Sequence, residues 1–425
     1  MNNEIKSVIL AAGKGTRMKS NTSKVLHKIF EKPILGYVLD NSKNIVSESF
    51  VIVGHHAEEV TEFVEKNYTN AKTILQSPQL GTGHAVSMAC PYLENFEGQV
   101  IILNGDLPLM TEESIRKFIE YHNSKNSDLT IMSTILEDPA NYGRIIREKD
   151  DSLKCIVEAK DATPEEISVK EINVGVYLLN WSKIKPAFSQ LTTNNAQGEY
   201  YLTDIIGWGK KNNLNVHAYI LENSDESYGI NSRKDLAYAT KVMNERKLNS
   251  LMDNGVTIVD PTSTWISEDT EIGADTIIYP STYIEGKNKI GKNCKIGPCA
   301  HLRGDVEIDD NCKIGNFVEV KKAKIGHNTN AGHLSYIGDS ELGSHINIGA
   351  GTITANYDPI SKTKSKTILK DNVKIGSNTV LVAPVEIGEG TNIGAGSVIT
   401  KNIGAWALGL TRAPLRIIEN WVKNR

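Results

Sequence analysis

A glycine-rich segment near the start of the chain has the residue types that bind phosphate. The string LAAGKGTRM runs from Leu10 to Met18 and follows an aliphatic stretch. Its two glycines let backbone amides approach a phosphate, and Arg17 adds a permanent positive charge. The string has neither the Gly-Lys-Ser/Thr of a P-loop nor the G-x-G-x-x-G spacing of dinucleotide-binding folds. By itself it is equally compatible with a plain turn between a strand and a helix.

The second half of the chain contains a histidine among cationic and amide side chains. His333 follows Arg303 and Lys321 and precedes Asn347. A neutral imidazole can accept a proton from an attacking amine near physiological pH, and cations can hold a phosphate. The less specific interpretation is a structural histidine on a solvated surface, which is the commoner situation for a single histidine.

The sequence around His333 repeats every six residues. A period of six fits neither a helix nor a flat strand, so each aliphatic residue must mark the same corner of a coil whose neighbours stack. Glycine often follows the aliphatic residue, where a tight turn needs permissive torsions. The pattern predicts a hexapeptide solenoid. The aliphatic positions in unbroken register are Ile272, Ile278, Ile284, Ile290, Ile296, Leu302, Ile308, Ile314 and Val320.

A second position of the repeat is reserved for small side chains. These residues lie four positions after each aliphatic one, and we expect them to fill narrow inward slots. The register slips by one residue near Lys324 and Glu341 and then continues. The small residues are Thr276, Thr282, Asn288, Cys294, Ala300, Val306, Cys312 and Val318.

The first half of the chain alternates aliphatic runs with amphipathic segments. Strands are predicted at residues 7–12, 50–54, 100–103, 129–133 and 174–179, and a helix at 112–121. This alternation predicts a mostly parallel α/β sheet with ligands at the carboxyl ends of its strands. We expect one helix at 232–254, with Ser232 and Asp235 as a capping box and Gly255 as its end. The predicted domains are 1–231 and 255–412, joined by this helix and followed by a tail, 413–425, with helical spacing.

Composition excludes several classes of protein. A net charge of −4 over 425 residues provides no global field that would attract nucleic acid. The longest apolar runs are too short to span a bilayer. Five cysteines without a Cys-x-x-Cys pair argue against a disulfide framework and a zinc knuckle. The N-terminal stretch lacks a secretory pattern, so we expect a cytoplasmic protein without membrane insertion.

The glycine-rich string, followed by Ser23-Lys24-Val25-Leu26, closely resembles the signature of sugar-nucleotide pyrophosphorylases, which join a nucleoside triphosphate to a sugar 1-phosphate. Further motifs match in the family's order: Gln76 with Gly81-Thr82-Gly83-His84-Ala85, Gly105-Asp106, Tyr142-Gly143-Arg144, Ile156-Val157-Glu158, Glu171-Ile172-Asn173 and Gly229-Ile230-Asn231.

With the hexapeptide domain, nearly the whole chain resembles the bacterial bifunctional N-acetylglucosamine-1-phosphate uridyltransferases and glucosamine-1-phosphate N-acetyltransferases. The resemblance implies an α/β Rossmann-like nucleotidyltransferase domain followed by an all-β left-handed parallel β-helix. It also implies UTP and acetyl-CoA as co-substrates and Mg²⁺ as a cofactor.

The resemblance implies a first site for UTP and N-acetylglucosamine 1-phosphate. Arg17 and Lys24 would neutralise phosphates as catalytic cations. Asp106 and Asn231 would bind Mg²⁺, a hard cation that prefers oxygen ligands, although Asp106 could instead cap a helix before Pro108. Asn104 stands where a tyrosine is common. The implied nucleotide and sugar ligands are Leu10, Ala11, Ala12, Gly13, Gly15, Thr16, Arg17, Lys24, Gln76, Gly81, Thr82, Asn104, Gly105, Gly143, Glu158 and Asn173.

The resemblance implies a second site in the solenoid. His333 would be the base, with Glu319 as a candidate to orient it and Ser377 as a candidate to stabilise an oxyanion. The implied ligands of glucosamine 1-phosphate are Arg303, Lys321, Tyr336, Asn347 and Lys364. The implied ligands of acetyl-CoA are Ala350, Asn356, Tyr357, Ser377, Ala395 and Arg412. Residues 358–366 are about two longer than the family pattern, so Lys364 is favoured over Lys362 only by its Lys-x-Lys-Thr context.

The implied partners are small-molecule sugar phosphates, and the implied assembly is a homotrimer with active sites between subunits.

Two alternative functions stay open. The chain could be a single-activity sugar-1-phosphate nucleotidyltransferase with a structural hexapeptide domain, against which His333 and Asn356-Tyr357 argue. It could also be a pure binding or scaffold protein, in which the glycine-rich string and Asp106 would have no catalytic use.

Overall fold

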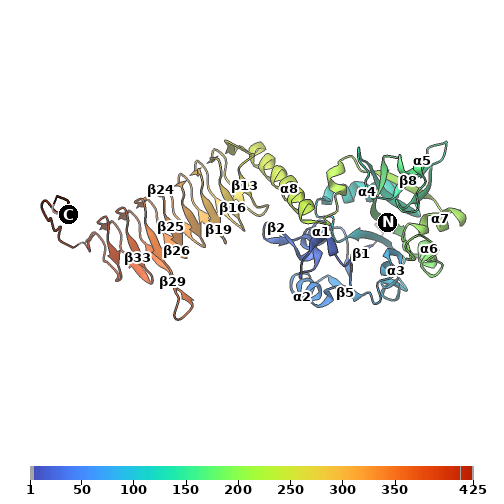
Figure 1. Cartoon of the computed structure of the whole chain (residues 1–425), viewed down its shortest axis with the longest axis horizontal. Helices are drawn as coiled ribbons and strands as arrows, with labels where there is room; N and C mark the ends of the chain where they lie inside the picture. Colours follow the sequence, from blue (N-terminus) through green and yellow to red (C-terminus); the bar gives the residue numbers. More distant parts are fainter. Residues whose placement is uncertain (1–3, 412, 424–425) are drawn as a thin grey trace. The chain divides into compact units, whose positions relative to one another are not determined.

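The computed structural model describes residues 4–411 and 413–423. Their contacts divide the chain into two compact units, one up to Val242 and the other from Met243 onward (Figure 1). Within the described residues, no helix combines the length and the apolar character needed to cross a bilayer.

The first unit is built on a nine-stranded, mostly parallel sheet with the order β11-β7-β10-β6-β1-β4-β5. A hairpin of β8 and β9 pairs with β10 at the side of this path. All five predicted strands and the predicted helix, α4, are confirmed. The strands are β1 (Ile5–Ala11), β4 (Glu48–Val53), β5 (Ala71–Leu75), β6 (Gln99–Asn104), β7 (Leu129–Ile135), β8 (Arg144–Arg147), β9 (Leu153–Val157), β10 (Glu171–Asn180) and β11 (Val216–Ile220), with a separate pair β2 (Lys28–Ile29) and β3 (Lys32–Pro33).

Strand β10 runs antiparallel to both of its main neighbours, β6 and β7. After β7 ends at Ile135, the chain forms β8, β9 and a short helix without crossing back over the sheet. It therefore enters β10 at the edge where β7 ended, and Glu171 pairs with Ile135. Because β8 and β9 lie at this edge, they stand beside the carboxyl ends of the parallel strands.

Two apolar clusters cover the two faces of the sheet, because successive strand residues point to opposite sides. Val8 belongs to one cluster and its neighbour Ile9 to the other. Helix α4 begins after Thr111, whose side chain accepts a hydrogen bond from the Ser114 amide. The helices are α1 (Ile34–Ser42), α2 (Ala57–Asn67), α3 (Thr82–Ser87), α4 (Glu112–Ser124), α5 (Pro164–Ile167), α6 (Trp181–Ile184) and α7 (Asp204–Lys211), with 3-10 turns η1 (Thr16–Met18), η2 (Lys24–Leu26), η3 (Cys90–Leu93), η4 (Lys185–Ser189) and η5 (Ser224–Ser227).

The second unit is a parallel β-helix of three walls, as the six-residue period predicts (Figure 1). Wall 1 contains β12 (Thr257–Ile258), β15 (Ile277–Ile278), β18 (Lys295–Ile296), β21 (Lys313–Asn316), β24 (Asn330–His333), β27 (Asn347–Ile348), β32 (Lys374–Ile375), β35 (Asn392–Ile393) and β37 (Leu408–Gly409). Wall 2 contains β13 (Trp265–Ile266), β16 (Tyr283–Glu285), β19 (His301–Arg303), β22 (Glu319–Lys321), β25 (Tyr336–Gly338), β28 (Ile353–Ala355), β33 (Val380–Val382) and β36 (Val398–Ile399). Wall 3 contains β14 (Glu271–Ile272), β17 (Lys289–Ile290), β20 (Glu307–Ile308), β23 (Lys324–Ile325), β26 (Ser340–Leu342), β31 (Thr367–Leu369) and β34 (Val385–Ile387).

The slip in the repeat shortens a coil without breaking the stack. Ile296 lies opposite Ile314, eighteen residues later, whereas Ile308 lies opposite Ile325, seventeen residues later. The missing residue comes from a corner, so the aliphatic side chains of each wall stay aligned. The expected small-residue slots are all buried, and they hold Thr276, Thr282, Asn288, Cys294, Ala300, Val306, Cys312 and Val318.

The helix predicted after the first unit is α8 (Arg233–Asp253). Its start has the expected capping box, because Asp235 Oδ2 accepts the Ser232 amide at 2.7 Å and Ser232 Oγ accepts the Asp235 amide at 3.3 Å. Gly255 follows it with a left-handed φ of 88°. The boundary between the units falls inside α8, because its second half contributes Leu248 and Leu251 to the core of the β-helix.

The prediction of helical spacing in the tail is wrong for the described residues 413–423, which form turns and irregular structure. Leu415 is 87% exposed, and Ile418 and Val422 are also exposed. A short amphipathic segment is a stable helix only when its apolar face packs against another surface. The exposure of Leu415, Ile418 and Val422 shows that these three side chains do not have such packing among the described residues. Arg412, a predicted acetyl-CoA ligand, lies outside the described residues.

Candidate active sites

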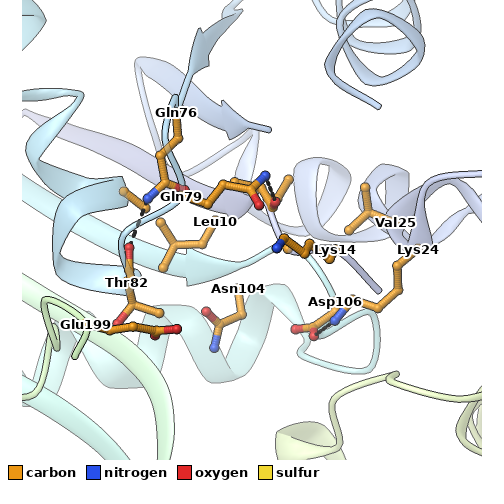
Figure 2. Close-up of a pocket in the computed structure, with 15 residues that line it drawn as sticks. Leu10, Lys14, Lys24, Val25, Gln76, Gln79, Thr82, Asn104, Asp106 and Glu199 are labelled. Carbon is orange, nitrogen blue, oxygen red and sulfur yellow. Dashed lines mark hydrogen bonds and ion pairs between the residues drawn. The ribbon is translucent and has the colours of Figure 1, made fainter. Parts of the chain in front are cut away.

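The first candidate site lies at the carboxyl ends of β1 and β6. Leu10 and Asn104 pair near the ends of these strands, and the Gly105 amide donates to the Leu10 carbonyl at 2.9 Å. The glycine-rich string therefore leaves the sheet beside Asp106. A cavity of about 450 Å³ opens here (Figure 2), lined by Leu10, Ala11, Ala12, Gly13, Lys14, Lys24, Val25, Gln76, Gln79, Gly81, Thr82, Ala85, Asn104, Asp106 and Glu199.

Two glutamines fix the loops on one side of this cavity. Gln76 Nε2 donates to the Gly81 carbonyl at 3.0 Å, and Gln79 Nε2 donates to the Ala12 carbonyl at 2.8 Å. Gly81 has a φ of 111°, and an added Cβ would lie 2.6 Å from the Tyr200 carbonyl oxygen. Only glycine fits at that position, so the loop after β5 has one available path along the cavity.

Lys24 and Asp106, which line this cavity, meet the side chain of Asn231. Lys24 Nζ lies 2.5 Å from Asp106 Oδ2 and donates to Asn231 Oδ1 at 3.1 Å. The side chains of Lys24 and Asp106 are 13% and 20% exposed. The next helix, α4, is capped by Thr111, so Asp106 is not its cap.

The Asp106 and Asn231 oxygens suit a hard cation, because both already point at one positively charged group. Among the described residues, no group of three or more His, Cys, Asp and Glu side chains could hold a metal. A metal at this point would therefore take its remaining ligands from water and substrate phosphate, which is typical of Mg²⁺.

Four predicted nucleotide ligands do not line the cavity. Gly15 has a φ of 59°, and an added Cβ would lie 2.8 Å from the Lys24 Cβ, so this glycine lets η2 pack beside the string. Thr16 and Arg17 are exposed on η1, and Gly105 is buried in the turn after β6.

A second cavity, of about 250 Å³, adjoins the first and shares Leu10, Thr82, Asn104 and Asp106 with it. Its other lining residues are Leu107, Asn141, Tyr142, Gly143, Glu158, Asn173, Val174, Gly175, Tyr177, Leu202, Thr203, Gly229 and Asn231. The two cavities form one site, with Asp106 where they meet. The predicted sugar ligands Gly143, Glu158 and Asn173 are together in this second part.

Glu158 is the main titratable group of the second cavity. Burial raises its pKa, and the nearby carboxylates of Asp161 and Asp204 act in the same direction. Thr203 Oγ1 donates to Glu158 Oε1 at 3.4 Å. Asn173 also lines this cavity, and its Nδ2 donates to the Tyr177 hydroxyl at 2.9 Å. The cavity thus presents hydrogen-bonding groups suited to sugar hydroxyls and an amide.

Sequence reasoning missed several lining residues. Lys14 lies within the quoted glycine-rich string, and Gln79 lies between two predicted ligands, so both had a local signal. Glu199 and Thr203 had none, because the loop that carries them approaches the site only through tertiary packing.

The second candidate site lies on the β-helix. Arg303 and Lys321 are neighbours in wall 2, and Glu319 pairs there with Tyr336. Glu319 accepts hydrogen bonds from Arg303 Nε at 2.7 Å and Nη2 at 2.6 Å. Glu319 therefore orients Arg303, whereas it was expected to orient His333, which ends β24 in wall 1.

A hairpin interrupts the coil after β28 and projects from the stack (Figure 1). It consists of β29 (Tyr357–Asp358) and β30 (Thr363–Lys364), in which Lys364 pairs with Tyr357. Burial, together with the neighbouring cations Lys364 and Arg303, lowers the pKa of Lys321. Lys364 is therefore close to Lys321, whereas Lys362 lies in the hairpin's turn with a φ of 57°.

Asn356 connects the base of the hairpin to wall 2. Its Nδ2 donates to Asp339 Oδ2 and lies 3.5 Å from the Tyr336 hydroxyl. The hairpin is therefore tied to the strand that carries Tyr336, and Tyr357, which is exposed, begins its first strand.

Four predicted residues form a row along the corner between walls 1 and 2. Each stands two residues after an inward-facing residue of wall 1, and those inward residues are register partners in successive coils. The row consists of His333, Ala350, Ser377 and Ala395. Asn347 begins β27 in wall 1, where it pairs with Asn330. One edge of the β-helix thus carries an imidazole, small side chains and a hydroxyl in sequence.

Comparisons with known proteins agree with this architecture. The nucleotidyl transferase family model matches residues 6–225, and the bacterial transferase hexapeptide (six repeats) model matches residues 289–322 and 366–401.

Relatives match along nearly the whole chain. The bifunctional protein GlmU of Caldanaerobacter subterraneus subsp. tengcongensis is 44% identical, covering 99% of this chain and 98% of that protein. The protein of the same name from Geobacillus thermodenitrificans is 43% identical, covering 98% and 97%.

The bifunctional protein GlmU of Alkaliphilus metalliredigens is 41% identical, covering 99% of each chain. That alignment spans 456 positions against 425 residues here, so this relative has segments that the chain lacks. With such identity over both units, the chain belongs to the GlmU family of bifunctional proteins.

Proposed function

We propose that the chain catalyses two consecutive steps of UDP-N-acetylglucosamine synthesis. It acetylates glucosamine 1-phosphate with acetyl-CoA, and it then transfers UMP from UTP to N-acetylglucosamine 1-phosphate. The observation that carries this proposal is the match of both units to relatives that are named bifunctional. The two separate constellations, one in each unit, support it.

In the uridylyl transfer, a phosphate oxygen of N-acetylglucosamine 1-phosphate attacks the α-phosphorus of UTP. The bond from that phosphorus to its bridging oxygen breaks, and pyrophosphate leaves. The reaction needs no protein nucleophile, so the chain contributes position and charge. Gln76 and Gly81 hold the nucleotide, while Gly143, Glu158 and Asn173 hold the acetylated sugar. Lys24 and Arg17 neutralise phosphate charge.

Asp106 and Asn231 are the proposed ligands of Mg²⁺. Bound there, the ion would neutralise charge that develops on phosphate oxygens. This assignment is supported by the two oxygens that converge on the Lys24 ammonium. Lys24 is then free to turn toward a substrate phosphate once another cation occupies its place.

In the acetyl transfer, the amine of glucosamine 1-phosphate attacks the thioester carbon of acetyl-CoA. His333 takes the amine proton, the carbon–sulfur bond breaks, and the CoA sulfur leaves and is protonated. Arg303, Lys321 and Lys364 hold the sugar phosphate as a group of cations. The corner row that begins at His333 is the proposed path of acetyl-CoA, with Ser377 donating to the oxyanion.

A homotrimer and a cytoplasmic location stay predictions. The trimer is supported by the family resemblance and by the position of Asn347, which begins β27 in wall 1, whereas Arg303, Lys321 and Tyr336 belong to wall 2. Size-exclusion chromatography with light scattering would measure the mass of the assembly. A monomer that keeps full acetyl transfer would exclude a site that is shared between subunits.

Mass spectrometry of products tests the proposed function directly. One reaction contains UTP, N-acetylglucosamine 1-phosphate and Mg²⁺, and the other contains acetyl-CoA and glucosamine 1-phosphate. We expect UDP-N-acetylglucosamine with pyrophosphate from the first and N-acetylglucosamine 1-phosphate with free CoA from the second. Chelation of Mg²⁺ should stop the first reaction alone. If only the first product forms, the chain is a single-activity nucleotidyltransferase with a structural β-helix.

A further inference from the structure

The sugar cavity has two walls that come from different parts of the first unit. The β8–β9 hairpin supplies one of them, because Gly143 immediately precedes β8 and Glu158 immediately follows β9. Strand β10 supplies the other through Asn173. The separation between the hairpin and β10 therefore decides how closely these three residues surround a sugar.

In the part of the chain that the structure describes, backbone pairing joins the hairpin to β10 only at its base. Arg144 and Ile172 are the register pair between β8 and β10, and the Asn173 amide donates to the Gly143 carbonyl at 2.9 Å. Beyond Arg144 the hairpin continues to a turn at Asp151. The buried side chains of Ile145 and Leu153 pack the hairpin against an apolar cluster, and Lys210 Nζ of α7 donates to the Leu153 carbonyl. Beyond Arg144, its distance from β10 itself depends on contacts between side chains.

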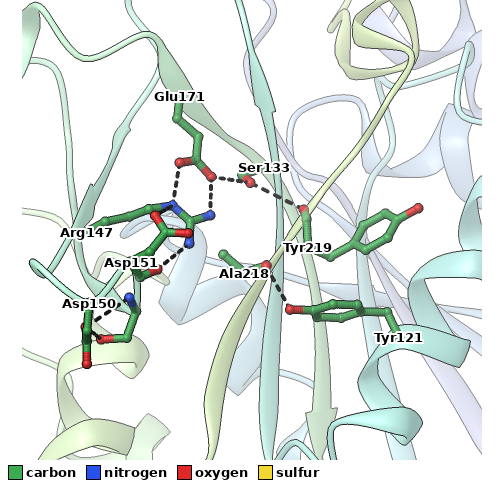
Figure 3. Close-up of polar contacts among 9 residues, drawn as sticks. Tyr121, Ser133, Arg147, Asp150, Asp151, Glu171, Ala218 and Tyr219 are labelled. Atoms are coloured by element: carbon green, nitrogen blue, oxygen red, sulfur yellow. Dashed lines mark hydrogen bonds and ion pairs between the residues drawn. The ribbon is translucent and has the colours of Figure 1, made fainter.

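Arg147 and Glu171 make such a contact between the hairpin and β10 (Figure 3). Arg147 Nε donates to Glu171 Oε2 and Nη2 donates to Oε1, each at 2.7 Å. Arg147 Nη1 donates to the Asp151 carbonyl at 2.8 Å, so the same guanidinium also holds the hairpin's turn. The two side chains are only 20% and 12% exposed, so water screens this pair less than an ordinary surface pair.

The surroundings of the pair orient both partners. Ser133 Oγ donates to Glu171 Oε1 at 2.6 Å and lies 3.3 Å from the Tyr219 carbonyl, which connects Glu171 to β7 and β11. The β8–β9 register shifts between Ile146 and Arg147, and a bulge of this kind redirects the side chain that follows it. Glu171 lies two residues before Asn173 on β10, so both face the same side of the sheet.

We propose that Arg147 and Glu171 are positioning residues for N-acetylglucosamine 1-phosphate. Their ion pair holds the β8–β9 hairpin at the distance from β10 at which Gly143, Glu158 and Asn173 close around the sugar. Neither side chain lines the cavity, so both act through the residues that do. This inference rests on the proposed uridylyl transfer. It explains the glutamate of the Glu171-Ile172-Asn173 motif, to which no substrate contact is assigned.

The test compares steady-state uridylyl transfer by Arg147→Met, Glu171→Gln and the double variant in the full-length protein. Each single variant should raise the KM for N-acetylglucosamine 1-phosphate about tenfold, with a smaller change in kcat and with the KM for UTP within about twofold of wild type. The KM of the double variant should be no higher than that of either single variant, because the two residues act as one unit. Arg147→Lys keeps the positive charge but cannot donate two parallel hydrogen bonds to the carboxylate. Its KM for N-acetylglucosamine 1-phosphate should therefore lie between those of wild type and Arg147→Met.

The matched control is Arg116→Met. Arg116 donates twice to Glu112 on α4, but this pair is exposed and lies within one helix. Its removal should leave both KM values unchanged. Acetyl transfer by the same samples, together with their melting temperatures, reports whether each variant is folded.

Three outcomes are decisive. If wild-type protein forms no UDP-N-acetylglucosamine, the proposed function itself fails. If wild type is active and Arg147→Met and Glu171→Gln keep its KM for the sugar phosphate, the positioning inference is wrong. Equal increases in both KM values for all variants, Arg147→Lys included, would mean that the pair only stabilises the fold, which also overturns the inference.

Discussion

The ammonium of Lys24 lies 2.5 Å from Asp106 Oδ2, although 82 residues separate the two in the chain. Asn231 Oδ1 completes the contact from a third segment. A positive charge thus occupies the point where two oxygens converge, and the proposed Mg²⁺ would take the place of that ammonium. The cluster links Lys24, which follows the glycine-rich string in the sequence, to the proposed metal ligands.

Asp106→Ala should lower kcat/KM for uridylyl transfer by at least about 100-fold, because it removes a carboxylate from the centre of the proposed phosphate site. Acetyl transfer should be unchanged, because its proposed residues all lie in the other unit. Product formation from each substrate pair, measured on one sample, checks both statements. Loss of both activities in a folded variant would contradict the assignment of Asp106 to one reaction.

His333→Ala should abolish acetylation of glucosamine 1-phosphate, because no other group in the corner row can accept the amine proton. Uridylylation of ready-made N-acetylglucosamine 1-phosphate should continue at the wild-type rate. His327 provides a matched control, since it is also exposed and also stands two residues after an inward residue, Ile325, but in wall 3. The His327→Ala variant should acetylate glucosamine 1-phosphate at the wild-type rate. Unchanged acetylation by His333→Ala would eliminate it as the base.

Lys364→Ala should raise the KM for glucosamine 1-phosphate about tenfold or more, because it removes a cation beside Lys321 from the proposed phosphate site. Lys362→Ala changes the same charge two residues away, in the turn of the hairpin, and should have little effect. Acetylation rates over a range of glucosamine 1-phosphate concentrations separate the two. A larger effect of Lys362→Ala would reverse the choice between them.

Glu158→Gln should raise the melting temperature of the protein and also raise its KM for N-acetylglucosamine 1-phosphate. Burial raises the pKa of Glu158, so above that pKa the folded protein carries a carboxylate that costs free energy. The variant should therefore melt about 1–3 °C higher than wild type at pH 7.5. The difference should shrink as the pH falls through the raised pKa, because wild-type Glu158 then takes up a proton.

The same variant should raise the KM for N-acetylglucosamine 1-phosphate about tenfold, since a neutral amide accepts a hydroxyl hydrogen bond less strongly than a carboxylate. Melting curves and kinetics at several pH values provide the two measurements. A variant that melts below wild type at pH 7.5 would show that the buried charge is not a cost.

Local pattern predicted the parts of the molecule in which neighbouring residues decide the structure. The six-residue period predicted the β-helix, because the side chains of each coil repeat the same inward and outward directions. Each coil can therefore stack on another coil of the same kind. The capping box at Ser232 and Asp235 predicted the start of α8 in the same way. The helical spacing of the tail failed as a predictor, because Leu415, Ile418 and Val422 stay exposed among the described residues and therefore do not stabilise a helix by packing.

Motif order was enough to assemble most of the first site, since Gln76, Asp106, Glu158 and Asn173 each stand in or beside a recognisable string. The order of the motifs could not show that Gly15 leaves room for the Lys24 side chain. It also could not show that Glu199 and Thr203 reach the cavities from a distant loop. Those contacts depend on how loops cross, which no short string encodes.

By itself, the sequence determined that this protein has an α/β unit followed by a hexapeptide β-helix, because the periodicity of apolar residues acts over a few residues. Only the tertiary structure decided that Lys24 contacts Asp106 and Asn231. It also decided that Glu319 accepts hydrogen bonds from Arg303, and that Arg147 joins the β8–β9 hairpin to β10 through Glu171. The physical reason is that a hydrogen bond or ion pair needs two side chains within about 3 Å and correctly aimed. For residues far apart in the chain, packing alone sets that distance.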